Sequence, residues 1–207
     1  MEPYNLPLRI AVAEFTEKKS RFIGSIAPVS TEDEALVFLR SIRERHREAT
    51  HNVYAYRVKT TGSSRHSDDG EPSGTAGMPL LDVFVKQGIY DFCCVATRYF
   101  GGILLGAGGL VRAYSRCGAA AIEASGVGVM REMTLCAATL PYALYESAKR
   151  LLSSHGAVID SEDFGAEIDM GFLVHREELA MLQSKFKEMT AGAASIREEG
   201  TQMRICE

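Results

Sequence analysis

The stretch FCCVATRYFGGILLGAGGLVRAYSRCGAAAIEASG, residues 92–126, joins an apolar segment to a helical pattern through a glycine-rich turn. Residues 92–100 are apolar enough to predict a central strand of a sheet. Residues 106–126 predict a helix with a face of small side chains, which allows close packing against that sheet. The free N–H groups at the start of such a helix, together with its dipole, can hold an anion.

Cationic side chains accompany the start of this helix. Arg112 and Arg116 are four residues apart on one helix face, and Arg98 ends the preceding strand. We expect the three guanidinium groups to converge there, and each can bind a phosphate or carboxylate through two hydrogen bonds. The candidate binding residues of the turn itself are Gly101, Gly102, Gly106, Gly108 and Gly109.

Two interpretations of this turn stay open, anion binding and close packing. Its G-x-G-G spacing differs from the G-x-G-x-x-G fingerprint of dinucleotide sites, and Ala107 stands where a P-loop has Lys. A small anion can still bind the helix start without either fingerprint. Alternatively, the glycines only allow a tight turn and close packing of the helix against the sheet.

The segment SDDGEPSGTAGMP, residues 67–79, combines acids with turn-forming residues. Gly70 and Pro72 predict a rigid loop, whose acids Asp68, Asp69 and Glu71 cap backbone N–H groups and are also candidate binding residues. That reading calls for no metal and no cofactor. Two alternatives stay open, because hard carboxylate ligands suit Mg²⁺ or Mn²⁺ and loops on a firm scaffold often carry catalytic groups.

The segment HNVYAYRV, residues 51–58, predicts a strand. Its alternation places His51 and Arg57 on one face, and both are candidate binding residues. A histidine near carboxylates can act as a general base, but no paired nucleophile is recognisable in this sequence. We therefore interpret His51 as a hydrogen-bonded structural histidine first and as a base second.

The remaining pattern predicts an α+β protein with two domains, residues 1–133 and 134–207. In the first, residues 9–29 predict two strands around a polar turn, and the Thr31–Glu34 capping box starts a helix. A short helix is expected after the acidic loop, from Pro79. In the second domain, residues 134–205 follow a βαββαβ order, which is typical of a ferredoxin-like antiparallel sheet with both helices on one face.

The charge distribution limits the class of partner. The chain has a net charge of −4, but residues 1–133 hold 16 Lys and Arg against 15 Asp and Glu, whereas residues 134–207 hold 7 against 12. The first domain can therefore bind a local anionic ligand. Tight nonspecific binding of duplex nucleic acid is not expected, because it needs many cationic contacts to phosphates.

Composition also bears on the compartment. The five cysteines form no CxxC pair, so we read them as small buried hydrophobic residues of a reducing compartment. Neither a signal peptide nor an uninterrupted run of about 18 apolar residues is recognisable. We expect a cytoplasmic protein without a membrane segment, and a monomer.

Four motifs, in the same order, resemble the IMPACT family and its bacterial YigZ branch. They are KKSRFIG (18–24), HNVYAYR (51–57), SDDGEPSGTAGMP (67–79) and TRYFGGILLGAGGLVRAYS (97–115). The resemblance implies an N-terminal domain with the βαβ-rich fold of a ribosomal small-subunit protein. It implies a C-terminal domain similar to the last domain of elongation factor G.

The resemblance also implies a link to translation. Eukaryotic relatives regulate translation by competing for the activator of a stress-responsive initiation-factor kinase, and the family has no settled catalytic residues. This chain has Met78 and Leu104 where some relatives carry a cation, which weakens an anion site near the loop. Three functions are weighed. The favoured one is a translation-linked protein that binds RNA, a ribosomal component or a protein partner. The alternatives are an enzyme acting on a phosphorylated or carboxylated small molecule, and a protein-interaction module without a small ligand.

Overall fold

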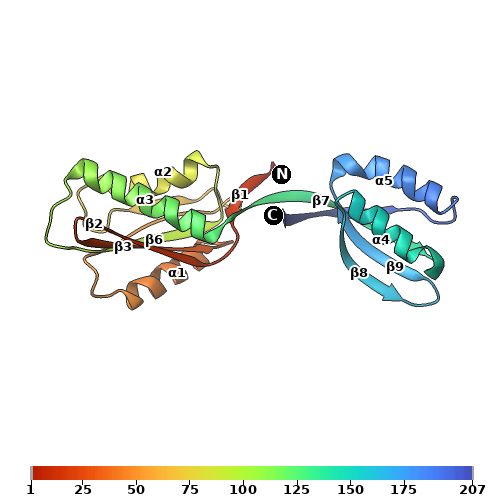
Figure 1. The fold of residues 1–207 in the computed structure, drawn as a ribbon, viewed down its shortest axis with the longest axis horizontal. Coiled ribbons are helices and arrows are strands. Elements are labelled where there is room, and N and C mark those ends of the chain that lie inside the picture. Colours follow the sequence, from red (N-terminus) through yellow and green to blue (C-terminus); the bar gives the residue numbers. More distant parts are fainter. Residues whose placement is uncertain (1, 207) are drawn as a thin grey trace. The chain divides into compact units, whose positions relative to one another are not determined.

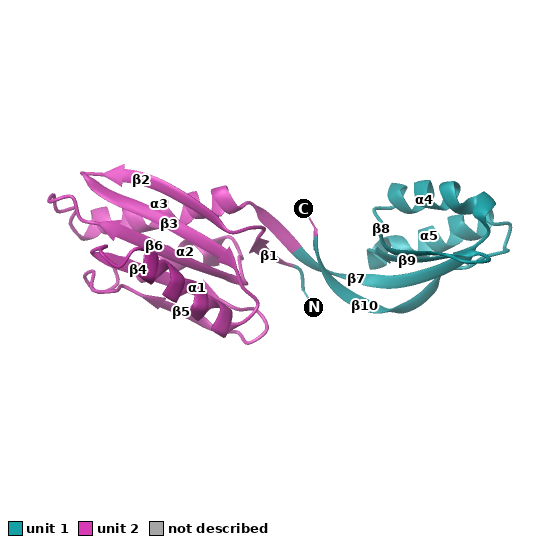
Figure 2. Ribbon diagram, turned by 90° about the horizontal axis from the view of Figure 1, so that it is seen from below, with its two compact units in different colours: residues 1–3, 130–205 teal, residues 4–129, 206–207 magenta. Residues whose placement is uncertain are grey.

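The computed structural model describes residues 2–206, which form two compact units (Figures 1 and 2). The larger unit is built on residues 4–129 and the smaller on residues 130–205. Both combine helices with antiparallel sheets, so the predicted α+β class is confirmed. In the part of the chain described, no helix has both the length and the apolar character needed to cross a membrane.

The larger unit is organised around a sheet with the strand order β2-β3-β6-β4-β5. All neighbouring strands run antiparallel. β6 lies in the middle and is buried at every residue except its last, which confirms the predicted central strand. The strands are β2 (Ala11–Glu17), β3 (Ser20–Pro28), β4 (His51–Arg57), β5 (Ser64–Ser67) and β6 (Phe92–Tyr99).

Helices cover both faces of this sheet, α1 (Glu32–Arg45) on one and α2 (Gly77–Lys86) with α3 (Ala107–Ser125) on the other (Figure 1). The alternation of β6 explains the two layers. Cys93 and Val95 belong to the core beneath α1, whereas Cys94 and Ala96 belong to the core beneath α2 and α3. A strand buried on both faces has no polar side to alternate, which is why its sequence reads as a continuous apolar run.

Local signals set the ends of several elements. At the start of α1, the Thr31 hydroxyl accepts a hydrogen bond from the Glu34 N–H at 3.2 Å, and the Glu34 carboxylate accepts one from the Ser30 N–H at 2.6 Å. The predicted capping box is thus confirmed, with Ser30 as its second donor. Two short strands were missed, β1 (Tyr4–Pro7) and β5, because four residues are too few for a recognisable alternation.

The smaller unit confirms the predicted βαββαβ order. Its strands lie in the order β10-β7-β9-β8. Alternate residues of β7 and β9 share one core with both helices, so the helices cover one face of the sheet. β7 begins seven residues earlier than Thr134. The elements are β7 (Val127–Leu140), α4 (Tyr145–Ser154), which follows a short 3-10 turn (Tyr142–Leu144), β8 (Val158–Phe164), β9 (Ile168–Val174), α5 (Arg176–Met189) and β10 (Arg197–Cys206).

The capping box yields a first prediction. Thr31→Ala removes the acceptor for the Glu34 N–H and should lower the free energy of unfolding by about 1 kcal/mol. Urea denaturation measures this directly. Thr60→Ala is the matched control: Thr60 is exposed in a turn, and its variant should stay within about 0.5 kcal/mol of the unaltered protein. Equal losses from both variants would contradict the role of the cap.

Candidate functional site

The acidic loop is folded around Asp68. Its carboxylate accepts hydrogen bonds from the backbone N–H groups of Gly74, Ala76 and Gly77, at 2.8, 3.0 and 2.8 Å. Two of these N–H groups stand at the start of α2, which has neither a side-chain cap of its own nor an acid in its first turn. Asp68 therefore supplies, from outside the helix, the negative charge that a helix start favours.

These contacts decide the ionisation of Asp68. Burial acts to raise its pKa, but the hydrogen bonds from the three backbone N–H groups act against burial and leave the pKa below its ordinary value of 3.8. The side chain is thus held as a carboxylate. Its negative charge is used within the loop.

The polar atoms of Asp69 are also engaged in contacts within the protein. The backbone of Asp69 has a positive φ of 44°. Its carboxylate accepts hydrogen bonds from the Asn52 N–H at 2.7 Å and from Arg43 at 2.8 Å. The carbonyl oxygen of the same residue lies 2.8 Å from Nδ1 of His51. Within residues 2–206, no group of three His, Cys, Asp or Glu side chains could hold a metal ion.

Glu71, the third acid, points into the interior instead. Its Oε1 accepts a hydrogen bond from Arg98 at 2.6 Å and another from the Tyr114 hydroxyl at 2.7 Å. The side chains of Glu71 and Arg98 are only 4% and 5% exposed, so this is a buried ion pair. Burial first, and the contact with Glu71 second, raise the pKa of Tyr114 far above its ordinary value and keep the hydroxyl as a donor.

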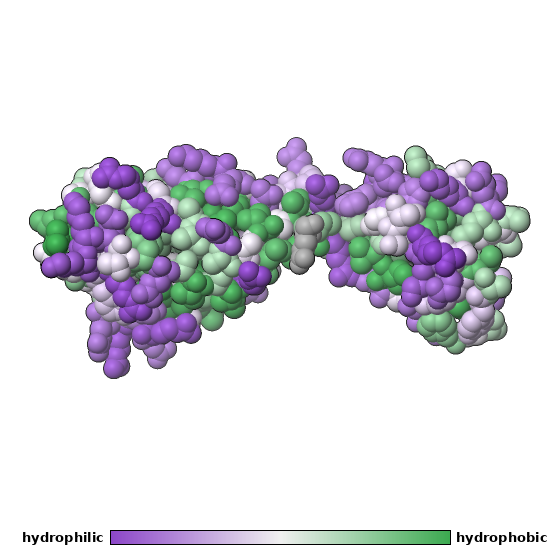
Figure 3. Space-filling view, in the orientation of Figure 1, coloured by the Kyte–Doolittle hydropathy of each residue, from purple (hydrophilic) through white to green (hydrophobic). Residues whose placement is uncertain are grey.

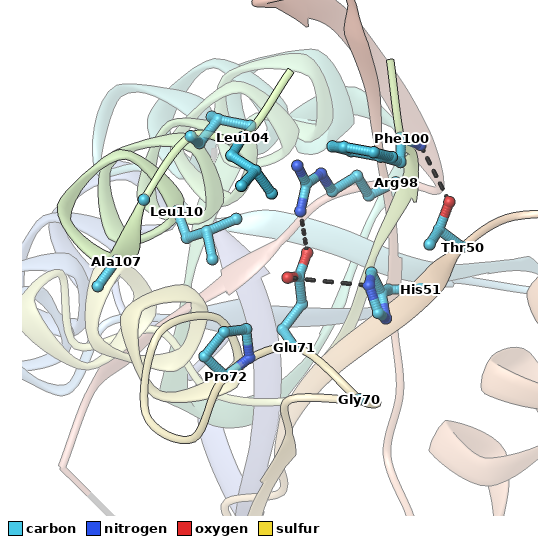
Figure 4. A pocket seen from close by; sticks show the side chains of 12 residues that line it. Thr50, His51, Gly70, Glu71, Pro72, Arg98, Phe100, Leu104, Ala107 and Leu110 are labelled. Atoms are coloured by element: carbon cyan, nitrogen blue, oxygen red, sulfur yellow. Dashed lines mark hydrogen bonds and ion pairs between the residues drawn. The ribbon is translucent and has the colours of Figure 1, made fainter. Parts of the chain in front are cut away.

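A cavity of about 370 Å³ opens beside this ion pair. His51, Glu71 and Arg98 are directed toward one another on one side of it, and Leu104 and Leu110 lie across from them (Figure 4). Its volume falls within the range of roughly 300–1,000 Å³ that is typical of small-molecule sites. The remaining lining is mostly apolar and comes from Thr50, Gly70, Pro72, Phe100, Leu105, Gly106 and Ala107. We call this space the Glu71 cavity.

The start of α3 forms part of the cavity wall. Gly106 precedes the helix with φ of +71°, and the helix start has no side-chain cap and no acid in its first turn. No acid of its own first turn therefore offsets the dipole of this 19-residue helix at this end. The loop before it is apolar and exposed, with Leu104 at 81% exposure, and Figure 3 shows apolar side chains at the surface near the start of α3.

A second hollow, of about 190 Å³, shares Leu105 with the Glu71 cavity as a lining residue. It is lined by Lys18 from the β2–β3 turn and by Arg112 and Arg116 from α3. The one carboxylate in its lining, Glu17, is 3.8 Å from Arg116 at the exposed surface. We call it the basic hollow.

Comparison with known proteins identifies the family of the chain. The Impact N-terminal domain family matches residues 18–122, about half of the chain. The chain belongs to the IMPACT family. A domain of unknown function, DUF1949, matches residues 139–193 within the smaller unit. All residues of the Glu71 cavity, from Thr50 to Leu110, fall within the matched Impact segment.

Individual relatives agree with this assignment. IMPACT family member YvyE of Bacillus subtilis is 36% identical over 189 residues, which cover 89% of this chain and 86% of that protein. IMPACT family member YigZ of Escherichia coli is 40% identical over 117 residues, covering 55% of this chain and 57% of the relative. A crystal structure described as that of a hypothetical protein is 28% identical, with a TM-score of 0.60 over 100% of this chain and 98% of the other.

The structure separates the residues that the sequence analysis expected to converge. His51, Glu71, Arg98 and Gly106 line the Glu71 cavity. Three others, Gly109, Arg112 and Arg116, line the basic hollow. The expected convergence of the three guanidinium groups is wrong, because Arg98 is ion-paired with Glu71 inside the protein while Arg112 and Arg116 line the basic hollow.

Arg57 lies elsewhere. Its guanidinium donates a hydrogen bond to the Ile89 carbonyl oxygen at 3.2 Å and stacks 3.8 Å from the centre of the Tyr90 ring. It joins neither the cavity nor the hollow. Sequence reasoning also missed Tyr114 and Ser20, the two hydroxyl residues that complete the Glu71–Arg98 contact. The sequence did contain a signal for Tyr114, because it stands among the small residues of the buried α3 face. A buried tyrosine hydroxyl there needs a hydrogen-bond partner.

The glycines of the turn have different roles. Gly101 lies against the backbone of Lys19 and Ser20, and a Cβ placed on it would overlap both residues. Its N–H also donates to the Ser20 hydroxyl at 3.2 Å. Gly102 and Gly106 instead have positive φ values of 83° and 71° in open space. The packing reading therefore holds for Gly101, where close approach brings the Lys18 turn next to α3.

The position of Asp68 generates a prediction about pH. Asp68→Asn should lower the free energy of unfolding at neutral pH by about 1–3 kcal/mol, because charge-assisted hydrogen bonds to three N–H groups are weakened. Since the folded-state pKa lies below 3.8, this contribution is present above 3.8 and is lost as the pH falls through the folded-state value.

Urea denaturation of both proteins, from neutral pH down to about 3, measures the difference. The difference in free energy of unfolding between the unaltered protein and Asp68→Asn should become smaller at acid pH. A difference that is independent of pH would show that the charge of Asp68 is not what stabilises the loop.

The close approach at Gly101 predicts a steric effect. Gly101→Ala should lower the free energy of unfolding by at least about 2 kcal/mol, because the backbone of the β2–β3 turn must move. Gly108→Ala is the matched control. Its Cβ would meet nothing nearer than Arg112 at 3.7 Å, and alanine in a helix should leave stability unchanged or raise it by up to about 1 kcal/mol. Thermal unfolding of the two variants separates these outcomes.

Proposed function

We propose that this IMPACT family member is a cytoplasmic, translation-linked binding protein that contacts RNA or a ribosome-associated partner through its N-terminal unit. Membership of the family supports a regulatory role, and the resemblance described above supports the link to translation. The cysteines support a reducing compartment, because all five are free and four of them are buried.

The observation that carries this proposal is the basic hollow. Lys18, Arg112 and Arg116 come from two segments that are almost a hundred residues apart in the chain, and they face one carboxylate, that of Glu17. The uncapped start of α3 adds its dipole beside them. Cationic side chains and helix starts of this kind hold the phosphates of nucleic acids.

The charge of the chain sets the type of RNA contact. The whole protein is acidic, with a net charge of −4, so it lacks a continuous basic surface for a long duplex. A hollow with three cations fits one or two phosphates of a single strand. The affinity for RNA should therefore be modest, and the logarithm of the binding constant should fall only gently with the logarithm of the salt concentration.

Charge removal in the hollow tests the proposal. The double variant Arg112→Ala/Arg116→Ala should bind RNA or ribosomes at least tenfold more weakly at low salt, because two phosphate contacts are lost. The slope of log K against log salt should fall by up to about 1.4, since each phosphate contact to a single strand contributes about 0.7. Cosedimentation with ribosomes and fluorescence anisotropy with labelled RNA are suitable measurements.

A control of equal charge is available on α1 and in the turn that follows it. Arg40 and Arg47 are exposed and lie outside both lining sets, so Arg40→Ala/Arg47→Ala changes the net charge of the same unit by the same amount. This control should bind like the unaltered protein. If both double variants lose affinity equally, net charge rather than the hollow controls binding, and retention of full binding by the Arg112 and Arg116 variant would refute the proposal.

An enzyme acting on a phosphorylated or carboxylated small molecule is the second candidate. The observation in its favour is that Glu71 lines a partly enclosed cavity together with a histidine, which is an arrangement suited to acid–base chemistry. Asp68 and Asp69 do not share this role, since the Asp68 carboxylate is used by the loop itself and the Asp69 carboxylate by Asn52 and Arg43. A thermal-shift screen discriminates between the two functions: a small anion that stabilises the protein, where RNA does not, would favour the enzyme.

A further inference from the structure

The floor of the Glu71 cavity holds two hydrogen-bond acceptors that face each other. Nδ1 of His51 lies 2.8 Å from the carbonyl oxygen of Asp69, which can only accept, so Nδ1 carries the hydrogen. In the neutral imidazole, Nε2 is then an acceptor. It faces Oε2 of Glu71 across 3.8 Å, which is longer than a hydrogen bond (Figure 4).

Neither acceptor is satisfied by the protein. Glu71 takes both of its hydrogen bonds, from Arg98 and Tyr114, on Oε1. Among the hydrogen bonds of the described chain, none reaches Oε2 of Glu71 or Nε2 of His51. Two acceptors in a partly enclosed site favour a ligand that brings at least two hydrogens on one atom.

The surroundings of the two acceptors favour a neutral donor over a cationic one. The guanidinium of Arg98 and the positive end of the α3 dipole both line the cavity, and both disfavour an ammonium group. The walls across from the acceptors are apolar, and Phe100, which lies on the Arg98 side of the cavity, is 44% exposed. A flat group with an uncharged amine can stack on such an aromatic ring while it donates to the floor.

We propose that the Glu71 cavity binds one nucleobase of single-stranded RNA through its exocyclic amino group, which donates to Nε2 of His51 and Oε2 of Glu71. The inference rests on the proposed RNA contact and adds a base preference to it. Adenine, cytosine and guanine carry such an amine, whereas uracil and hypoxanthine carry a carbonyl oxygen that faces the two acceptors unfavourably.

The neighbouring basic hollow fits the rest of the nucleotide. Leu105 lines both spaces, so the backbone of a nucleotide whose base occupies the cavity can extend toward Lys18, Arg112 and Arg116. Phosphate contacts in the hollow then supply affinity without sequence preference, and the cavity supplies the preference. This division of roles makes the two contributions separable by experiment.

Matched oligoribonucleotides test the proposal on the unaltered full chain. Two pairs of short labelled oligomers are compared, adenosine with inosine and cytidine with uridine. In each pair the first base carries an exocyclic amine where the second carries a carbonyl oxygen. Fluorescence anisotropy at low salt should give at least about tenfold tighter binding for the amine member of each pair. Equal affinities within both pairs would overturn the base preference and would leave the phosphate contact intact.

A histidine variant connects the preference to the cavity. His51→Asn keeps an N–H that can donate to the Asp69 carbonyl and removes the Nε2 acceptor, so it should reduce the preference to within about twofold. His66→Asn is the control, because His66 is exposed on β5 and outside the cavity lining, and it should keep the full preference. A preference that survives His51→Asn would place the base elsewhere.

The remaining outcomes separate this inference from the function on which it rests. If no oligomer binds, the RNA function fails. The cavity alone is then tested with adenosine and inosine as free nucleosides. Their binding is monitored through the amide chemical shifts of Gly70 and Ala107. Preferential shifts with adenosine would support the amine site for a small ligand. If neither nucleoside shifts these amides, and only a ribosomal protein binds, the inference is overturned.

Discussion

The buried ion pair between Glu71 and Arg98 is the constraint on which the site depends. It joins the loop of residues 67–79 to the central strand β6, and Tyr114 adds α3 to the same contact. Removing two charges from water costs several kcal/mol, which only short, well-directed hydrogen bonds can offset. Either residue alone would be an uncompensated buried charge, so the loop, the strand and the helix hold their relative positions together.

The other parts of the site follow from that anchored loop. Asp68 reaches the start of α2, and Asp69 holds both Arg43 and, through its carbonyl oxygen, His51. The imidazole is thereby fixed with its free nitrogen toward Glu71. The close approach at Gly101 brings the Lys18 turn against α3. A cavity with acceptors and a hollow with cations thus become neighbours.

Several features of this region work against stability. Nε of Arg98 is buried and, among the residues described, has no hydrogen-bond partner. Leu104 and Phe100 are exposed, and the start of α3 has no capping side chain. Such departures from the rules of packing and capping concentrate where a protein binds something. The function is therefore argued from this region of the larger unit, since the fold by itself does not specify one.

The amino-acid sequence by itself determined the elements whose signals are local. The apolar run of β6, the capping box of α1 and the βαββαβ order of the smaller unit depend on periodicity and on residues a few positions apart. Four-residue strands such as β5 carry too little pattern to be read. Only the tertiary structure decided that Arg98 pairs with Glu71, 27 residues away, while Arg112 and Arg116 stay at the surface. Sheet register and helix packing set which distant charges meet, and neither is encoded in the spacing of the charges along the chain.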